Sequence, residues 1–305
     1  MKNTVSPSKW IKFDRMLSLD GEWVRSKLLR FFNEGGPFGD LNTRSFIPPE
    51  DVGDGKIIAE EACVFAGTEI LKHCLNDITR LDFSISDGDT LAPGTTIASL
   101  HGSVRDMQTR RKIILNLLRR LSGIATNVRK YAEVDAPKEF MILNARKASS
   151  GSSKLEDYAV SVGGGYSRRM NLSKPILLGE EHIAAAGGLR NAEAFSRSAH
   201  PEVPIQLKIS SFEQIEAALE IETDAVLLSD MTSKEVGECV SFLRSFPIGE
   251  SIFVEVSGAI TVTTLKDYIR TGINAASIRG LTTSDKSVNL KWTEDEAPRT
   301  VGKSD

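Results

Sequence analysis

The sequence predicts an α/β fold in which a helix and a small, mainly antiparallel sheet precede a series of β/α units. Three observations support this. Turn signals at Asp87-Gly88-Asp89 and Pro93-Gly94 separate short strand-like runs in the first hundred residues. From about Lys138 onward, short apolar runs alternate with helical patterns. The composition, with 40% hydrophobic and 26% charged residues, is that of a globular protein with a buried core.

The first part of the chain begins with a polar stretch to about Ser18, which predicts a flexible arm. A helix follows over 21–33, and the glycine-rich stretch at 35–39 ends it. Strand-like runs are 56–66, 78–85 and 95–101. A helix over 106–121 carries an apolar stripe and five basic residues (Arg110, Arg111, Lys112, Arg119 and Arg120). Those bases indicate either a solvated face or a site for an anionic ligand.

The second part predicts buried parallel strands with helices between them. About six such units can close into a barrel, and a doubly wound open sheet is the alternative. In both folds ligands bind at the carboxyl ends of the strands. The expected strands are 140–144, 175–178, 204–209, 225–228, 252–256 and 275–278, and the expected helices are 154–162, 190–199, 211–221, 232–245 and 262–271. The strand ends place these residues at the candidate site: 144–147, 179–182, Lys208, Ser229, Asp230, 255–257 and Arg279.

Charge and cysteine usage restrict the class of protein. The net charge is −3, so no overall basic field favours nucleic acid or an anionic membrane surface. Three cysteines without metal-ligand spacing fit a reducing compartment. No apolar run approaches the roughly 18 residues that span a bilayer, and the first residues do not resemble a signal peptide. We therefore expect a cytoplasmic protein whose affinity for anions comes from a local cluster.

Two loops contain clustered cations. Asn144-Ala145-Arg146-Lys147 follows a predicted strand, and a triple glycine at 163–165 leads into Arg168 and Arg169. Glycines let a backbone approach a ligand closely, and arginine suits phosphate or carboxylate. A surface loop remains the alternative for the first segment. Glu180-Glu181-His182 does not have metal-ligand spacing, so we expect no metal site there.

Several segments, in order along the chain, resemble the quinolinate phosphoribosyltransferase family. Leu115-Asn116 with the run from Leu121 to Thr126 is very similar to the family's L-N-x-x-x-x-x-S-G-I-A-T pattern. Further similar segments are 38–43 (G-D-x-T), 87–94 (D-G hairpin), 158–165 (Y-A-V-x-x-G-G-G), 255–258 (E-x-S-G) and 271–273 (T-G-V). The resemblance covers roughly residues 22 to 292.

This resemblance implies an N-terminal open-faced α/β sandwich followed by an incomplete α/β barrel. It also implies a homodimer in which one subunit's first domain covers the other's barrel mouth. The family's reaction joins quinolinate to the ribose of phosphoribosyl pyrophosphate, with Mg²⁺, and gives nicotinate mononucleotide with loss of pyrophosphate and CO2. Two carboxylates on the acceptor require arginine or lysine, and the pyrophosphate requires cations and metal.

Some positions depart from the family pattern. Lys208 and Ser229 stand where the family has a ribose-binding glutamate and aspartate, and Gly179 stands in place of a lysine. Arg168 replaces a histidine, and Arg279 lies in the family's V-G-x-L-T segment. The barrel mouth is therefore expected to be more cationic and poorer in carboxylates.

The expected domains are an arm at 1–18, a sandwich domain at 19–130 joined by the return of 284–305, and a barrel domain at 131–283. We expect a pentosyltransferase of NAD biosynthesis acting on a small anionic aromatic acid. The alternative is an inactive or repurposed homologue that binds an anionic metabolite as a sensor or partner protein. The expected catalytic residues are Lys147, Asp230 and Glu255, and the expected binding residues are Lys112, Arg146, Lys147, Arg168, Arg169, Lys208, Ser257, Gly258, Arg279 and Gly280.

Overall fold

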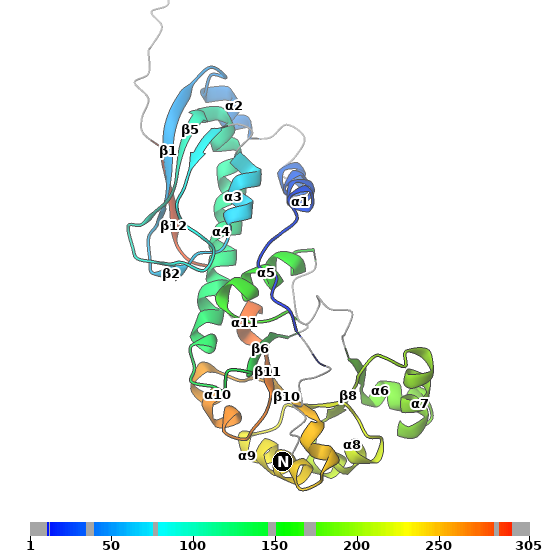
Figure 1. Cartoon of the computed structure of the whole chain (residues 1–305). Coiled ribbons are helices and arrows are strands. Elements are labelled where there is room, and N and C mark those ends of the chain that lie inside the picture. Colours follow the sequence, from blue (N-terminus) through cyan, green and yellow to red (C-terminus); the bar gives the residue numbers. More distant parts are fainter. Residues whose placement is uncertain are drawn as a thin grey trace, which may run out of the picture. The chain divides into compact units, whose positions relative to one another are not determined.

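The computed structural model describes residues 11, 13–34, 40–75, 79–145, 151–167, 175–283 and 287–294. The chain forms two compact units (Figure 1). The N-terminal unit contains 17–127 and 285–305, and the barrel unit contains 1–16 and 128–284. The division after Asn127 lies close to the expected boundary at residue 130, whereas the first residues group with the barrel unit.

The N-terminal unit contains a four-stranded antiparallel sheet in the order β12-β1-β5-β3. The C-terminal strand returns to this sheet, with Trp292 opposite Ile57. Because Ile57, Leu290 and Trp292 are buried, this return completes the core of the unit. The strands are β1 (Val52–Ala59), β3 (Thr79–Asp82), β5 (Thr96–Ser103) and β12 (Leu290–Glu294), with a separate pair of β2 (Cys63–Val64) and β4 (Thr90–Leu91).

Four helices belong wholly or partly to this unit: α1 (Gly21–Glu34), α2 (Leu41–Phe46), α3 (Thr68–Leu75) and α4 (Val104–Ala132). Neither α2 nor α3 was predicted. Asp40 caps α2 through the backbone N–H groups of Asn42 and Thr43. Asp87 accepts hydrogen bonds from the N–H groups at the start of α3, at 2.7 Å from Gly67 and 3.0 Å from Thr68.

The segment that most resembles the family, within α4, has a structural role. Ser122 Oγ accepts a hydrogen bond from the Ala66 backbone at 3.1 Å, and Thr126 Oγ1 accepts one from Val64 at 2.8 Å. These bonds attach the β2 segment to α4. Since Leu118 Cδ2 lies 2.2 Å from the position that a Cβ on Gly67 would occupy, only glycine fits there without rearrangement.

The barrel unit contains six parallel strands in the order β7-β8-β9-β10-β11-β6. From β7 to β11 this order follows the chain in one direction, and β6 joins beyond β11. A doubly wound sheet reverses direction at a switch point, so the order is that of a barrel left open between β6 and β7. The strands are β6 (Met141–Asn144), β7 (Ile176–Leu178), β8 (Ile205–Ile209), β9 (Ala225–Ser229), β10 (Phe253–Gly258) and β11 (Ala275–Ile278).

The expectation of a flexible arm is wrong for the arm residues that the structure describes. Ile11 and Phe13 are buried with Leu143, Ala225, Phe253 and Ala275, which share one face of the parallel sheet. The rings of Phe13 and Phe253 lie 6.2 Å apart. Asp14 forms a β-bridge with Ser167, and Tyr166 pairs with Leu143 of β6. Apolar residues at alternate positions hold this segment in the barrel interior.

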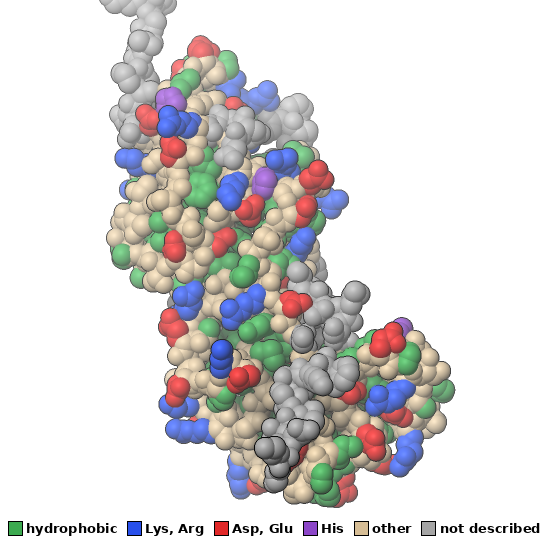
Figure 2. Space-filling view, viewed as in Figure 1, with side chains coloured by type: hydrophobic (Ala, Val, Ile, Leu, Met, Phe, Trp, Pro, Cys, Tyr) green, Lys and Arg blue, Asp and Glu red, His purple; other side chains and the backbone are tan. Residues whose placement is uncertain are grey.

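Helices α5 to α11 follow the strands and surround them in Figure 1. Charged side chains of both signs are spread over the surface that Figure 2 shows. None of the helices within the described ranges is long and apolar enough to cross a membrane. The helices are α5 (Ser153–Gly163), α6 (Glu180–Ala185), α7 (Leu189–Ala199), α8 (Glu216–Glu220), α9 (Ser233–Arg244), α10 (Val262–Ile269) and α11 (Gly280–Thr283), with 3-10 helices η2 (Phe212–Gln214) and η3 (Ile248–Ser251).

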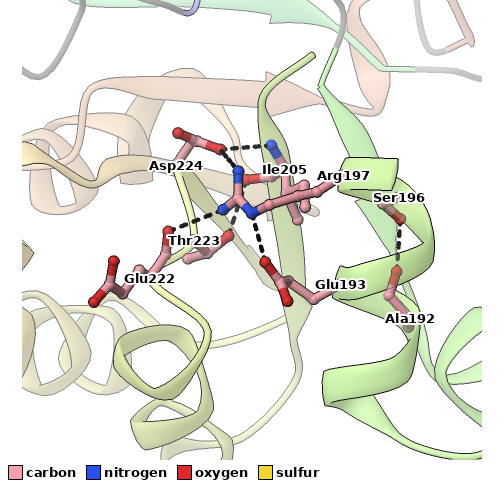
Figure 3. Close-up of polar contacts among 8 residues, drawn as sticks. All are labelled: Ala192, Glu193, Ser196, Arg197, Ile205, Glu222, Thr223 and Asp224. Atoms are coloured by element: carbon pink, nitrogen blue, oxygen red, sulfur yellow. Dashed lines mark hydrogen bonds and ion pairs between the residues drawn. The ribbon is translucent and has the colours of Figure 1, made fainter. Parts of the chain in front are cut away.

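Arg197 of α7 connects this helix to the amino ends of β8 and β9 (Figure 3). Its guanidinium lies 2.5 Å from Glu193, 3.3 Å from the Glu222 carbonyl and 3.8 Å from Asp224. Asp224 also accepts a hydrogen bond from the Ile205 backbone at 2.8 Å. The amino end of the sheet is therefore held by a connected set of polar contacts.

Candidate active site at the carboxyl ends of the barrel strands

The carboxyl ends of the parallel strands meet at one edge of the sheet. Ser257 of β10 pairs with Ser229 of β9 and with Ser277 of β11. Ile278 of β11 pairs with Asn144 of β6. The register therefore places Ser229, Asp230, Ser257, Gly258 and Arg279 side by side, as the sequence predicted.

An ion pair crosses the end of β10. Arg279 Nη2 donates to Asp230 Oδ1 at 2.9 Å, and the two residues follow β11 and β9, which flank β10. Asp230 has a φ of 56°, and its N–H donates to the Ser257 carbonyl at 2.8 Å. A Cβ on Gly258 would lie 3.6 Å from Asp230 Oδ1, in ordinary van der Waals contact. Gly258 therefore packs against Asp230.

Both partners of this ion pair remain in contact with solvent. The Arg279 side chain is 44% exposed and that of Asp230 is 61% exposed. Lys208, near the end of β8, is also exposed. Exposed ion pairs contribute about 0–1 kcal/mol to stability. The stability of the fold therefore does not require charged side chains at these positions.

Glu255, expected to be a catalytic carboxylate, is fully buried at 0% exposure. Its Oε1 accepts a hydrogen bond from Ser277 Oγ at 2.5 Å, and its Oε2 accepts one from Gln206 Nε2 at 2.9 Å. These three side chains lie on the same face as Phe253 and Ala275, which is the barrel interior. Glu255 thus differs from Asp230, because it holds neighbouring strands together and has no surface for a ligand.

Two buried polar pairings at this end were not anticipated. Gln206 supports Glu255, and Asn144 Nδ2 donates to Asp157 Oδ1 of α5 at 2.7 Å. Gln206 and Asn144 are both less than 5% exposed. The available signal was a polar residue within an otherwise apolar predicted strand. Such a residue needs a partner when buried, although the sequence does not say which one.

Four of the expected cations, Arg146, Lys147, Arg168 and Arg169, lie outside the described residues. Lys112 is exposed on α4 in the N-terminal unit. Gly280 begins α11 directly after Arg279. The structure thus brings together the expected residues from β8 to β11 and leaves the acceptor cations as predictions.

The triple glycine packs closely against the chain's own helices. Gly164 ends α5 with a φ of 109°, and a Cβ there would lie 3.0 Å from Ala132. A Cβ on Gly165 would lie 2.8 Å from Val160 and 3.1 Å from Val128. The close approach that the glycines allow is therefore between α5 and the end of α4.

The histidine of the 180–182 segment and two of the cysteines have local structural surroundings. No group of three or more His, Cys, Asp or Glu residues that could hold a metal ion occurs in the described part of the chain. His182 Nδ1 accepts a hydrogen bond from the Gly179 N–H at 3.1 Å, so this histidine caps α6. Burial raises the pKa of Cys63 and Cys239 to about 11, which keeps both as thiols at neutral pH.

Comparisons with known proteins agree with this architecture. The quinolinate phosphoribosyl transferase N-terminal domain matches residues 40–122 and the C-terminal domain matches residues 124–293. A probable nicotinate-nucleotide pyrophosphorylase [carboxylating] of Bacillus subtilis is 32% identical over 271 residues, covering 88% of this chain and 92% of that protein.

Solved structures show the same fold. NadC from Streptococcus pyogenes is 27% identical, with a TM-score of 0.82 over 92% of this chain and 100% of that one. The nicotinate-nucleotide pyrophosphorylase from Francisella tularensis, at 22% identity, has a TM-score of 0.83 over 93% of this chain and 100% of that one. The chain therefore belongs to the quinolinate phosphoribosyltransferase family, as its sequence motifs predicted.

Proposed function

We propose that this protein is a phosphoribosyltransferase that transfers ribose 5-phosphate from phosphoribosyl pyrophosphate to a small anionic aromatic acid. The acceptor named in the reaction of the family is quinolinate, and the product is nicotinate mononucleotide. The observation that carries the proposal is the solvent-exposed set of Lys208, Arg279 and Asp230 at the carboxyl edge of the family's barrel.

The phosphate groups of the donor suit the edge formed by β8 to β11. Gly258 ends β10 beside Asp230, which is paired with Arg279. A guanidinium binds phosphate oxygens in a two-pronged geometry. We assign Ser257, Gly258, Arg279 and Gly280 to the ribose phosphate, and Lys208 and Arg168 to phosphate or pyrophosphate.

The acceptor's carboxylates require a second group of cations. We assign Lys112, Arg146, Lys147 and Arg169 to this task, on the strength of the family motifs in which they occur. Lys147, which we also expect to be catalytic, is the cation that we place in contact with the acceptor acid during the reaction. Lys112 provides charge but not the planar fork of an arginine, so it binds a carboxylate as a point charge.

Positive charge that develops at the anomeric carbon favours a nearby carboxylate. Asp230 is an exposed carboxylate at the strand edge and is our candidate to contact the ribose. Glu255 is buried beneath it with Ser277 and Gln206, so we assign Glu255 a positioning role. Lys208 and Ser229 occupy the positions of two acids that the family resemblance predicts.

Mg²⁺ enters this proposal as part of the donor. Magnesium in proteins keeps several waters and binds through substrate phosphates with only one or two carboxylates. Asp230 is compatible with one such contact. When bound, the ion neutralises charge that develops on the leaving pyrophosphate, while the residues of the chain hold the phosphates.

The test is titration calorimetry of the purified protein with phosphoribosyl pyrophosphate and Mg²⁺, with and without quinolinate. A pyrophosphate-release assay and chromatography for nicotinate mononucleotide follow on the same samples. Binding with release of pyrophosphate and formation of the nucleotide is the expected result.

Two other results reject parts of the proposal. Binding of the donor without pyrophosphate release points to a different acceptor or to a ligand-binding homologue. Absence of binding of both compounds rejects the phosphoribosyltransferase assignment for this chain. A Lys208→Glu variant helps to interpret binding without pyrophosphate release. It replaces a cation with a carboxylate at a position where the family resemblance predicts an acid.

The family resemblance also supports a homodimer, a cytoplasmic location and a role in NAD biosynthesis. Because one subunit's first domain covers the other's barrel mouth in the dimer that we expect, Lys112 would act on the partner's site. Light scattering gives the molar mass directly. A mixture of a Lys112→Ala protein with an Arg279→Ala protein tests shared sites, since mixed dimers regain one intact site.

A further inference from the structure

The N-terminal unit contains a cavity of about 390 Å³ between α1, α3 and α4. All the residues that line it belong to this unit, and none of them is assigned to the barrel site. The volume lies within the range of about 300–1,000 Å³ that small-molecule sites occupy. The lining residues are Arg25, Leu28, Leu29, Phe32, Lys72, His73 and Arg110.

One wall of the cavity is cationic. Arg25, Lys72 and Arg110 carry permanent positive charges, and His73 adds an imidazole ring. Glu69 contacts this wall, at 3.0 Å from Lys72 Nζ and 3.3 Å from His73 Nε2. None of the described residues that line the cavity is acidic. In Figure 2, basic side chains, a histidine and acidic side chains lie close together in this region.

The positions of two side chains of this wall, Arg110 and His73, are fixed by the fold. Arg110 Nη1 donates to the Cys74 carbonyl at 2.6 Å, and its guanidinium lies 5.7 Å from the centre of the Phe32 ring. A Cβ on Gly21 would lie 2.7 Å from the His73 ring, so the start of α1 packs directly on this histidine. Such fixed donors lose little freedom when a ligand binds.

The other wall is apolar. Leu28 is 2% exposed, whereas Leu29 is 62% exposed. Phe32 lies between the apolar residues and Arg110. An exposed leucine beside a cavity with converging cations is typical of a site for a ligand with an apolar body and an anionic group.

We propose that this cavity binds a small organic acid, with a carboxylate on a short aromatic or aliphatic body. The carboxylate lies between Arg25 and Arg110, and the body packs on Leu28, Leu29 and Phe32. An inorganic anion satisfies the cations but leaves the apolar wall uncovered, so it binds more weakly. The proposal is independent of the function assigned to the barrel.

The experiment uses benzoate and inorganic phosphate as probes in titration calorimetry, with amide chemical shifts to locate binding. Benzoate shifts amides of α1 and α3 and binds more tightly than phosphate. Arg25→Ala weakens benzoate binding about tenfold, the size expected for one charge-assisted hydrogen bond. Leu29→Glu abolishes binding, since it places a carboxylate at the rim. Both residues are exposed, so folding is retained.

Arg30→Ala is the matched control, because Arg30 is an exposed arginine of α1 that does not line the cavity. It leaves benzoate affinity unchanged, as does Arg279→Ala in the barrel. The proposal is overturned if Arg30→Ala weakens binding as much as Arg25→Ala, or if phosphate binds as tightly as benzoate. Shifts confined to the barrel strand ends, or no benzoate binding, overturn it as well.

Discussion

The two ends of the parallel sheet differ in how far their side chains are exposed to solvent. At the amino end, Phe13 is 8% exposed against Phe253, and Arg197 joins α7 to the segments before β8 and β9. At the carboxyl end, Arg279 and Asp230 are 44% and 61% exposed. One sheet thus has an amino end that is closed by packing and a carboxyl end with exposed charges, and the carboxyl end is where α/β barrels place their active sites.

The largest expected effect is at the amino end. Phe13→Ala removes a ring that packs on Phe253, and phenylalanine-to-alanine changes in cores cost about 3–5 kcal/mol of unfolding free energy. Urea denaturation measures this loss. Phe195→Ala is the control, since Phe195 is 63% exposed on α7 and its loss is expected to cost less than about 0.5 kcal/mol. Equal losses in both variants would show that Phe13 does not close the barrel.

The next effect is at the carboxyl end and concerns binding. Arg279→Ala removes the guanidinium that we assign to phosphate, and a hydrogen bond to a charged group contributes about 1.5–3 kcal/mol, or roughly 10–100-fold in Kd. Calorimetric titration with phosphoribosyl pyrophosphate and Mg²⁺ measures it. Unfolding free energy changes by less than about 1 kcal/mol, since the ion pair is exposed.

Arg270→Ala is the matched control for that experiment. Arg270 follows α10 and precedes the amino end of β11, and it pairs with Asp267 at 3.3 Å with 68% of its side chain exposed. Donor affinity is expected to stay the same in this variant. If both variants bind the donor equally well, Arg279 is not a phosphate ligand.

A smaller effect is the loss of stability on replacing Glu255, which distinguishes this buried carboxylate from the exposed Asp230. Glu255→Ala leaves Gln206 Nε2 and Ser277 Oγ without this acceptor, which costs about 1–3 kcal/mol of stability. Glu255→Gln costs less, because its amide can accept from Gln206 and donate to Ser277. Thermal and urea denaturation compare these variants with Glu238→Ala, an exposed change on α9. Unchanged stability of Glu255→Ala would contradict a positioning role.

The smallest effect is a pH dependence at the start of α9, directly after Asp230. The Thr232 backbone N–H and hydroxyl both donate to Glu235 at 2.7 Å and lower the pKa of this carboxyl from its ordinary value of 4.5. A lowered pKa adds stability that is complete above about pH 4.5 and is lost as pH falls through the folded-state value. Glu235→Gln keeps a hydrogen-bond acceptor but has no carboxyl group to titrate. Between pH 3 and 6 the urea midpoint of this variant should therefore lack the part of the pH dependence that comes from Glu235. Parallel profiles for the two proteins would exclude it.

Local pattern predicted most of the barrel. The runs at 225–228 and 275–278 are strands within a residue of the expected limits, because buried parallel strands are continuous apolar segments. Helix α3 was missed, since Asp87 caps it from a distant part of the chain. Helix α4 continues well beyond the expected end at residue 121, although Gly123 follows. There, Ser122 and Thr126 bind the β2 segment, so tertiary contacts outweigh the low helix propensity of glycine.

The sequence by itself indicated which residues end the strands and which cations follow them along the chain, because strand limits and charge are local properties. Only the tertiary structure decided how those residues pair. Asp230, with a φ of 56°, meets Arg279 across β10 because β9 and β11 flank that strand. Glu255 is enclosed by Gln206 and Ser277 because register brings three strands to one interior face. Pairing between strands depends on register and curvature, which no single segment of sequence contains.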